Sequence, residues 1–275
     1  MRFIAIFLIF FALFFPVTPT RAAAPTDFVS CYELDETSST RVDANTTNSN
    51  DLADNNTVLS TTGKQGNAAD FETTATEYLS ITDASQTNLD ITGDMSINFW
   101  VNFESLTTAR IINKANFAGA ERSFSFLWVN TATDYLRMYM FDGTTEYEPT
   151  VAWTPSTATW YMLTVVYDAS AGTQDYYVNG SQQGVQQTGA VTSMKNSTAD
   201  FTIGAAHAGE LPFDGFIDIA EIYNRTLTTD EITALYASGS GVTCAGRAAS
   251  EPEATTTPHA VFHGSTAITG ATVIQ

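Results

Sequence analysis

Basic residues are scarce in this chain of 275 residues, which has 11 Lys and Arg against 30 Asp and Glu. Nucleic acids and anionic membrane surfaces are bound mainly through lysine and arginine. A formal net charge of −19 therefore argues against both kinds of partner. An acidic surface of this kind favours solubility and the binding of cations.

Histidine is rarer still, and the common signs of zinc or nucleophile chemistry are missing with it. The three histidines are His207, His259 and His263, and none of them is spaced from a second ligand as zinc sites require. The Gly-x-Ser-x-Gly motif, which exposes the nucleophile of α/β-hydrolases, is also absent from the sequence. We therefore expect neither a zinc site nor a hydrolase of that type.

Long apolar runs are missing except at the N-terminus, where Arg2 precedes the apolar run Phe3–Phe15. A short basic start, an apolar centre and small residues after it are typical of a secretory signal peptide. We predict such a peptide at residues 1–22, with cleavage after Ala22 or Ala23. The alternative is a retained membrane anchor, for which the run is short.

Removal of this peptide takes away two arginines and no acid, which leaves 9 basic and 30 acidic residues. We expect a protein that is secreted or displayed at the cell surface, without membrane insertion of the mature domain.

Cysteine is limited to Cys31 and Cys244, one near each end of the β-rich part of the chain. In an oxidising compartment the default expectation for such a pair is a disulfide bond. The alternative is that Cys31 carries a lipid, because Val29-Ser30-Cys31 loosely resembles a lipobox. A lipobox normally abuts the apolar run, whereas some 15 residues intervene here.

Short apolar segments separated by Gly, Asn, Asp, Ser and Thr fill residues 27–244. This rhythm and length predict one all-β domain, a two-sheet antiparallel β-sandwich. The expected strands are Phe28–Leu34, Asn67–Phe71, Tyr78–Ile81, Met95–Phe103, Arg110–Asn113, Ser123–Val129, Tyr135–Phe141, Trp160–Asp168, Asp175–Val178, Ser181–Gln187, Phe201–Gly204 and Phe216–Tyr223.

A few local signals mark individual elements of this sandwich. Met95–Phe103 alternates between apolar and polar residues, as a strand with one buried face does. Asn179-Gly180 is a strong signal for a two-residue hairpin turn. A capped helix is expected at Thr229–Ala237, close to the C-terminal end of the domain, and a shorter one at Asp83–Leu89. Residues 245–275 are expected to form a linker and the start of a further segment.

The segment Phe213–Tyr236, FDGFIDIAEIYNRTLTTDEITALY, resembles the closing strand and helix of laminin-G-like domains. These jelly-roll domains, which include the pentraxin type, belong to the concanavalin A-like lectin/glucanase superfamily. Other blocks resemble the same family in its order along the chain. They are Cys31–Ser38, Gly63–Phe71, Glu77–Ile81, Ser96–Asn102, Trp160–Asp168, Tyr177–Gly180 and Phe201–Gly204.

The resemblance implies two antiparallel sheets with a concave and a convex face, and frequently one structural calcium ion. It also implies that the first and last strands are neighbours, which fits a Cys31–Cys244 disulfide. By resemblance, the calcium ligands are Asp43 and Asp51 in the loop after the first strand and Asp218 in the last strand. The alternative is that this Asn- and Asp-rich loop, residues 43–56, only forms turns.

Glucanases of the superfamily carry an E-x-D-x-x-E motif on one strand, whose nearest match here is Phe216-Ile-Asp218-Ile-Ala-Glu221. Phe216 stands where the first carboxylate is needed. Asp218 and Glu221 are three residues apart, so in a regular strand they point to opposite faces. Retaining cleavage needs two carboxyl groups about 5–5.5 Å apart. We therefore expect no catalytic residues.

Sugars are commonly bound by aromatic rings together with amide and carboxylate side chains. Trp100 lies between Asn98 and Asn102 on the polar face of its strand, and Trp128 and Tyr139 are further candidates. The alternative is that these aromatic residues belong to the core.

The sequence thus predicts a secreted, non-catalytic recognition module that binds a glycan or an extracellular protein, with calcium as its cofactor. Two other functions stay open at this point. One is a polysaccharide-cleaving domain, and the other is a purely architectural spacer.

Overall fold

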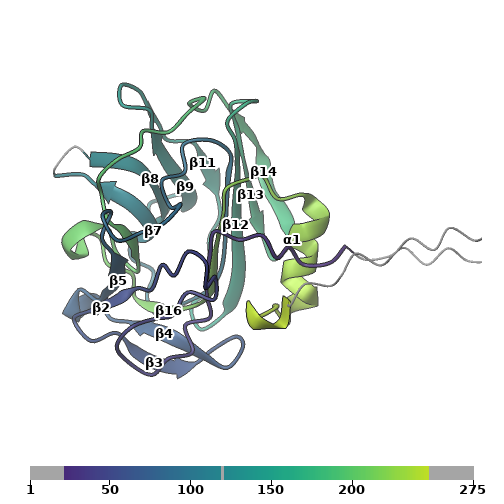
Figure 1. Cartoon of the computed structure of the whole chain (residues 1–275). Coiled ribbons are helices and arrows are strands. Elements are labelled where there is room, and N and C mark those ends of the chain that lie inside the picture. Colours follow the sequence, from purple (N-terminus) through teal and green to yellow (C-terminus); the bar gives the residue numbers. More distant parts are fainter. Residues whose placement is uncertain (1–21, 119–120, 248–275) are drawn as a thin grey trace, which may run out of the picture.

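The chain folds into two antiparallel β-sheets that face each other, with one short α-helix on the outside (Figure 1). The computed structural model describes residues 22–118 and 121–247. The predicted signal peptide and nearly all of the predicted C-terminal linker lie outside the described residues. The prediction of an all-β, two-sheet antiparallel sandwich is confirmed.

The first sheet is called the helix-side sheet here, because the α-helix lies on it. It has eight strands in the order β14-β13-β12-β6-β16-β4-β3, and β1 also pairs with β16. Its strands are β1 (Ser30–Tyr32), β3 (Leu59–Thr62), β4 (Asn67–Phe71), β6 (Met95–Phe103), β12 (Trp160–Asp168), β13 (Thr173–Val178), β14 (Ser181–Thr188) and β16 (Gly215–Tyr223).

The second sheet, called the opposite sheet, also has eight strands. Their order is β10-β9-β8-β7-β15-β5-β2, and β11 pairs with β9. They are β2 (Ala53–Asn55), β5 (Tyr78–Ile81), β7 (Ala109–Asn116), β8 (Glu121–Val129), β9 (Tyr135–Phe141), β10 (Glu146–Tyr147), β11 (Thr150–Ala152) and β15 (Phe201–Ile203).

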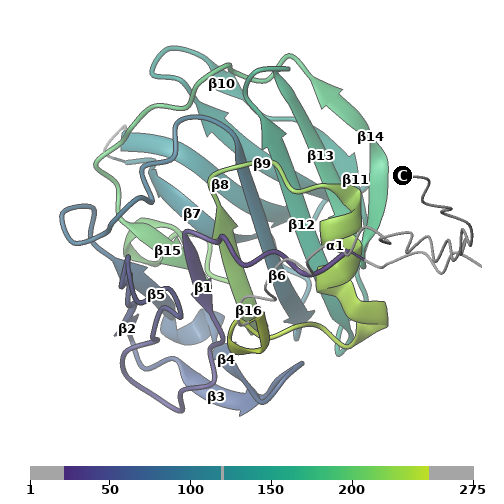
Figure 2. The ribbon, with the colours of Figure 1, turned by 45° about the vertical axis from the view of Figure 1, so that its right-hand side comes forward.

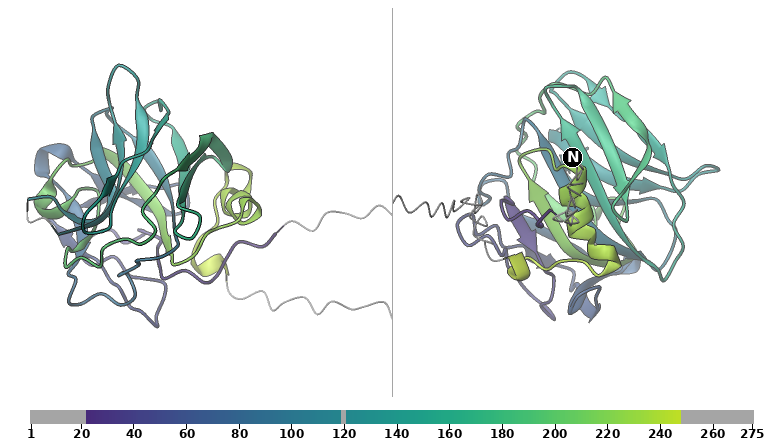
Figure 3. Two further views of the ribbon diagram at one scale, coloured as in Figure 1. Left: turned by 90° about the horizontal axis from the view of Figure 1, so that it is seen from above. Right: turned by 90° about the vertical axis from the view of Figure 1, so that its right-hand side faces the viewer.

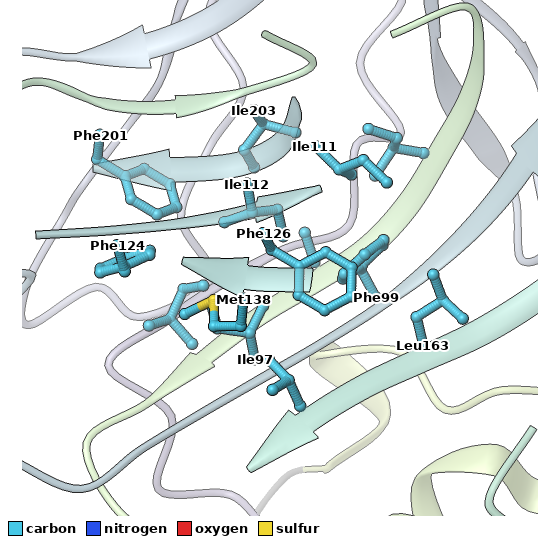
Figure 4. Packing of buried hydrophobic residues seen from close by; sticks show 14 of the residues in the cluster. Ile97, Phe99, Ile111, Ile112, Phe124, Phe126, Met138, Leu163, Phe201 and Ile203 are labelled. Atoms are coloured by element: carbon cyan, nitrogen blue, oxygen red, sulfur yellow. The ribbon is translucent and has the colours of Figure 1, made fainter. Parts of the chain in front are cut away.

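The hydrophobic core lies between the two sheets, as Figure 4 shows for part of it. Ile97, Phe99 and Leu163 point inward from the helix-side sheet, and Phe126 and Met138 point inward from the opposite sheet. Phe99 meets Phe126 edge to face, with 5.4 Å between the ring centroids. The period-2 pattern of each strand therefore places one face in this core.

Helix α1 (Thr229–Tyr236) packs on the outer face of the helix-side sheet and away from the opposite sheet (Figures 2 and 3). Its N-terminus has a capping box: the Glu231 amide donates to the Thr228 side chain, and the Thr228 amide donates to the Glu231 carboxylate. Ile232 and Leu235 pack with Trp100 and Met162 of the sheet, so a second apolar cluster forms under the helix.

Four short 3₁₀ helices complete the described structure. They are η1 (Thr73–Ala75), η2 (His207–Gly209), η3 (Ala237–Gly239) and η4 (Ala245–Arg247). The predicted helix at Asp83–Leu89 is wrong, because this segment forms turns. In the described part of the chain no helix is long and apolar enough to cross a membrane.

The predicted disulfide bond joins the first and last parts of the domain. Cys31 in β1 forms a disulfide bond with Cys244, 213 residues later, with the two Cα atoms 6.0 Å apart. The bond rules out the lipid-bearing alternative for Cys31, because its sulfur is already used. β1 pairs with β16, so the first and last strands are neighbours as expected. The Asn179-Gly180 turn joins β13 to β14, with φ of 52° and 78°.

Candidate functional site: the open outer face of the helix-side sheet

Five side chains form a row across five strands on the outer face of the helix-side sheet. The backbone register pairs Leu59 with Asp70, Asp70 with Phe216, Phe216 with Asn102, and Asn102 with Trp160. Residues that are directly paired in this way point to the same face of a sheet. We call this row, together with Glu72, Asp214 and Glu104 beside its central part, the open outer face.

Two aromatic rings form the apolar part of the open outer face. Trp160 and Phe216 are both half-buried, with ring centroids 6.4 Å apart and an angle of 44° between the planes. Asn102 lies between them in the register and is only 7% exposed. Its Oδ1 has no hydrogen-bond partner within the described residues. The site therefore presents ring faces next to an amide oxygen that still needs a donor or a cation.

Carboxylates form the other part of the open outer face. One oxygen each of Asp70, Glu72 and Glu104 lies within 4.8 Å of the others. Burial raises the pKa of Asp70, and the nearby charges of Glu72 and Asp214 raise it further. The pKa of Glu104 is raised by the same kinds of cause, burial first and then the neighbouring carboxylates. Negative charge is thus concentrated at this end of the sheet.

Asp218 of β16 lies next to the open outer face and binds the turn between β3 and β4. Asp218 Oδ2 accepts hydrogen bonds from the Lys64 and Gln65 amides, at 2.7 and 3.0 Å, and so holds the turn that links β3 and β4. The Gln65 side chain in turn donates to the Ser240 carbonyl, just after η3. Asp218 thus has a clear structural role in holding this turn.

A β-bulge in β16 changes the expected geometry of the glucanase-like motif. Asp218 pairs with Trp100 and Glu221 pairs with Asn98, so the register shifts between them, and Ile219 takes a positive φ of 46°. Trp100 and Asn98 lie two apart on β6 and share a face. The prediction that Asp218 and Glu221 point to opposite faces is therefore wrong, because the inserted residue returns Glu221 to the outer face.

Both carboxylates are nevertheless covered. Glu221 is fully buried, where it forms an ion pair with Arg247 and accepts a hydrogen bond from Tyr223 Oη at 2.6 Å. Asp218 is also fully buried, under the turn that it holds. Phe216 stands where the motif needs its first carboxylate. The described residues of this strand therefore do not present an accessible carboxylate pair.

Comparison with known proteins identifies the family. A laminin-G-like family model, described as "Concanavalin A-like lectin/glucanases superfamily", matches residues 73–233, which is more than half of the chain. The chain belongs to this superfamily. The fold class and the family resemblance that were read from the sequence are thus confirmed. No curated protein matches the sequence.

Solved structures with similar folds include binding domains of several kinds. Domain 4 of AbnA, a GH43 extracellular arabinanase from Geobacillus stearothermophilus in complex with arabinotriose, is 19% identical with a TM-score of 0.59. The alignment covers 75% of this lectin/glucanase-type chain and 97% of that domain. At such identities the likeness concerns the fold alone.

Two toxin domains are similar over about half of their own length. The binding domain of Paraclostridial Mosquitocidal Protein 1 is 14% identical with a TM-score of 0.61, over 78% of this chain and 52% of that one. The binding domain of botulinum neurotoxin DC, in complex with rat synaptotagmin II, is 13% identical with a TM-score of 0.59. That match covers 77% of this chain and 52% of the toxin domain.

The aromatic residues that sequence reasoning chose as a sugar platform are not exposed in this superfamily member. Trp100 is 2% exposed and stacks on Tyr236 at the end of α1, with ring centroids 5.8 Å apart. Trp128 is fully buried against Phe103 in the core, and Tyr139 is 2% exposed. The prediction of an exposed platform at these residues is wrong. A helix covers the strand face that the sequence pattern marked as polar.

The two amide side chains that were predicted to bind a ligand, Asn98 and Asn102, lie in different surroundings. Asn98 is buried and accepts a hydrogen bond from Thr164 Oγ1 at 2.7 Å, under the apolar cluster of α1. Asn102 is the one predicted binding residue that lies in the open outer face. Sequence reasoning missed Trp160, Phe216 and Asp70 as its neighbours, because only the strand register places them beside Asn102.

The predicted calcium ligands are engaged in hydrogen bonds. Asp43 accepts from the amides of Cys31, Asn45 and Asn50, and its own amide donates to Asp51 Oδ1 at 2.9 Å. Asp43, Asp51 and Asp218 are not among the groups of close carboxylates found in the described residues. Calcium at these three positions stays a prediction.

A separate polar cleft of about 570 Å³ lies beside the loop between β5 and β6. Its lining consists of residues 86–88, 90–94 and Asn224. These are mostly amide, hydroxyl and carboxylate side chains. The cleft therefore offers hydrogen bonds but no aromatic ring, unlike the open outer face.

Asp218 makes the stability of this protein depend on pH. Burial raises its pKa to about 7, against the opposing effect of the Gln65 and Lys64 amides. The unfolded pKa is about 3.9, so between these values the folded protein holds a proton that the unfolded chain lacks. The stabilisation by this proton is fully present below the unfolded pKa and is lost as pH rises through about 7.

The parent loses this stabilisation between pH 5 and pH 8, whereas Asp218→Asn has no proton to lose. We therefore expect the free energy of unfolding of Asp218→Asn, relative to that of the parent, to rise by about 2 kcal/mol from pH 5 to pH 8. Urea unfolding of both proteins at the two pH values, with a chelator present, measures this change. Asp134→Asn in the turn after β8 serves as the control. Parallel pH profiles of parent and Asp218→Asn would contradict the assignment.

Proposed function

We propose that this chain is an exported, non-catalytic recognition domain that binds a glycan on its open outer face. The observation that carries the proposal is the row in which Trp160 and Phe216 flank Asn102, with Asp70 next to Phe216. Aromatic rings stack on the apolar faces of sugar rings, while amide and carboxylate oxygens accept hydrogen bonds from hydroxyl groups. The row combines both kinds of group on one surface.

The charge of the surface narrows the class of glycan. Asp70 lies in the row and Glu72, Glu104 and Asp214 lie beside it, and their negative charges repel an anionic sugar. A neutral polysaccharide is therefore the ligand class that we propose. Domain 4 of AbnA, which was solved with arabinotriose, supports a glycan, whereas the toxin domain solved with synaptotagmin II supports a protein ligand as the second candidate.

Export and the lack of catalysis are parts of the same proposal. The apolar N-terminus supports export, and a disulfide bond between Cys31 and Cys244 is compatible with an extracellular domain. Phe216 at the first carboxylate position of the glucanase motif supports a non-catalytic role. A panel of polysaccharides assayed for released reducing ends tests this part, and release that persists after purification would overturn it.

Trp160→Ala is expected to weaken glycan binding about tenfold or more, because it removes one ring of the pair. A glycan array identifies the ligand, and isothermal titration calorimetry with that ligand then measures the affinity of the parent and the variant. Phe216→Ala is expected to act in the same direction. Both side chains are half-buried at the surface, so we expect the fold to persist.

Two matched controls locate the binding surface. Tyr135→Ala removes a half-buried ring from β9 of the opposite sheet, and Thr87→Ala removes a hydroxyl from the polar cleft. Neither change is expected to alter the affinity. If Thr87→Ala lowers the glycan affinity and Trp160→Ala does not, the binding site is the polar cleft. If the parent binds no glycan, the protein ligand or the architectural role is favoured.

A further inference from the structure

Three carboxylates meet on the open outer face although they come from two separate segments of the chain. Asp70 is near the end of β4, Glu72 follows that strand, and Glu104 follows β6. One oxygen of each lies within 4.8 Å of the others. Oxygens that share a calcium ion lie 2.3–2.6 Å from it, so a spacing of this size fits one ion between them.

The negative charge of this group is not balanced by the protein. In residues 22–118 and 121–247, no lysine, arginine or histidine forms an ion pair with Asp70, Glu72 or Glu104. Glu77 adds a further buried carboxylate, which accepts a hydrogen bond from the Glu72 amide at 2.9 Å. Several like charges held close together favour the uptake of a cation.

Asn102 provides an independent sign of a missing ligand. Its side chain is 7% exposed, and its Oδ1 has no hydrogen-bond partner among the described residues. Side chains alternate along a strand, so Asn102 points to the same face as Glu104, two residues further on. Asp70 Oδ1 is likewise buried and without a partner in the described structure. Buried oxygens of this kind need a donor or a metal ion.

We propose that Asp70, Glu72 and Glu104 bind one divalent cation, with Asn102 Oδ1 as a neutral oxygen ligand beside them. An all-oxygen set of carboxylates and an amide is the chemistry of calcium, and the set lacks the nitrogen and sulfur ligands that zinc prefers. The site differs from the Asp43, Asp51 and Asp218 set that the family resemblance implied. It also lies beside the row that carries Trp160 and Phe216, since Asp70 is paired with Phe216.

Calcium titration of the chelator-treated exported chain tests the proposal by calorimetry. One calcium ion is expected to bind per chain, and the double variant Glu72→Gln/Glu104→Gln is expected to weaken binding at least about tenfold, because it removes two ligand charges. The control is Asp134→Asn in the turn before β9, which is expected to leave the affinity unchanged. Asp51→Asn tests the set that the family resemblance implied. This experiment measures calcium binding alone, so the calcium proposal can fail while the glycan proposal holds, and the reverse.

Thermal unfolding shows whether the double variant is folded and whether calcium stabilises it. In chelator, Glu72→Gln/Glu104→Gln is expected to melt at or above the parent temperature, because like-charge repulsion is removed. With added calcium the parent is expected to gain in melting temperature and the double variant is not. The proposal is overturned by a parent that takes up no calcium, by uptake that survives in the double variant, or by uptake that Asp51→Asn abolishes.

Discussion

Replacing Arg247 with methionine is expected to lower the free energy of unfolding by about 3 to 5 kcal/mol. Arg247 is 6% exposed, donates to Tyr223 Oη at 2.8 Å and forms an ion pair with Glu221, which is fully buried. Burial lowers the pKa of Arg247 to about 10, so it stays charged at neutral pH. The substitution would leave the Glu221 charge buried without its partner.

Chemical unfolding of a double-mutant cycle measures this effect. Glu221→Gln/Arg247→Met removes both charges and is expected to recover part of the loss, because no unpaired ion is left inside. Arg122→Met is the matched control at the surface, where Arg122 pairs with the exposed Glu146 at 2.6 Å. It is expected to cost no more than about 1 kcal/mol. If Arg247→Met lowers the free energy of unfolding by as little as Arg122→Met does, the buried ion pair does not stabilise the fold.

Loss of the Cys31–Cys244 disulfide is the second large effect that we expect. The bond closes a loop of 213 residues, so it removes much conformational freedom from the unfolded chain. The chain-entropy relation gives about 5 kcal/mol for such a loop, and losses of about 2 to 5 kcal/mol are typical when a native disulfide is removed. Urea unfolding of Cys31→Ala/Cys244→Ala against the oxidised parent measures the change.

The reduced parent is the control for this prediction, because it keeps both sulfurs and loses only the bond. It is expected to unfold close to the double alanine variant, after allowance for the two small cavities that alanine leaves in the apolar cluster. A reduced parent as stable as the oxidised one would mean that β1 and the segment around Cys244 are held by packing alone.

The two effects are not expected to add. Arg247 follows Cys244 by three residues in η4, and its guanidinium lies 3.9 Å from Cys31 Sγ. The disulfide therefore helps to hold Arg247 against Glu221. Groups in direct contact commonly show a coupling free energy, so the combined variant should lose less than the sum of the separate losses.

Local signals in the sequence were reliable where the physical cause is itself local. The Asn179-Gly180 turn needs only two residues that tolerate positive φ, and the helix after Thr228 needs only its cap and an apolar stripe. The predicted helix at Asp83–Leu89 did not form, because a helix of seven residues is only marginally stable by itself. Tertiary contacts outweigh it here, such as the hydrogen bond that the Thr87 amide donates to the Asn50 side chain.

The candidate site was largely outside the reach of sequence reasoning. Asn102 was found because it lies on the polar side of an alternating strand. Trp160 and Phe216 were not found as its partners, because the three residues are neighbours only through the pairing of β12, β6 and β16. Trp100 was misplaced for a related reason, since a period-2 pattern says which side chains share a face and not what covers that face.

The sequence by itself determined the fold class, the family and the Phe at the first position of the glucanase motif. Each of these depends on residue identity or on periodicity along the chain. Only the tertiary structure decided that α1 covers Trp100 and that the bulge at Ile219 turns Glu221 to the outer face. Only the tertiary structure placed Glu104 next to Asp70 and Glu72, because strand register brings together segments that lie far apart in sequence.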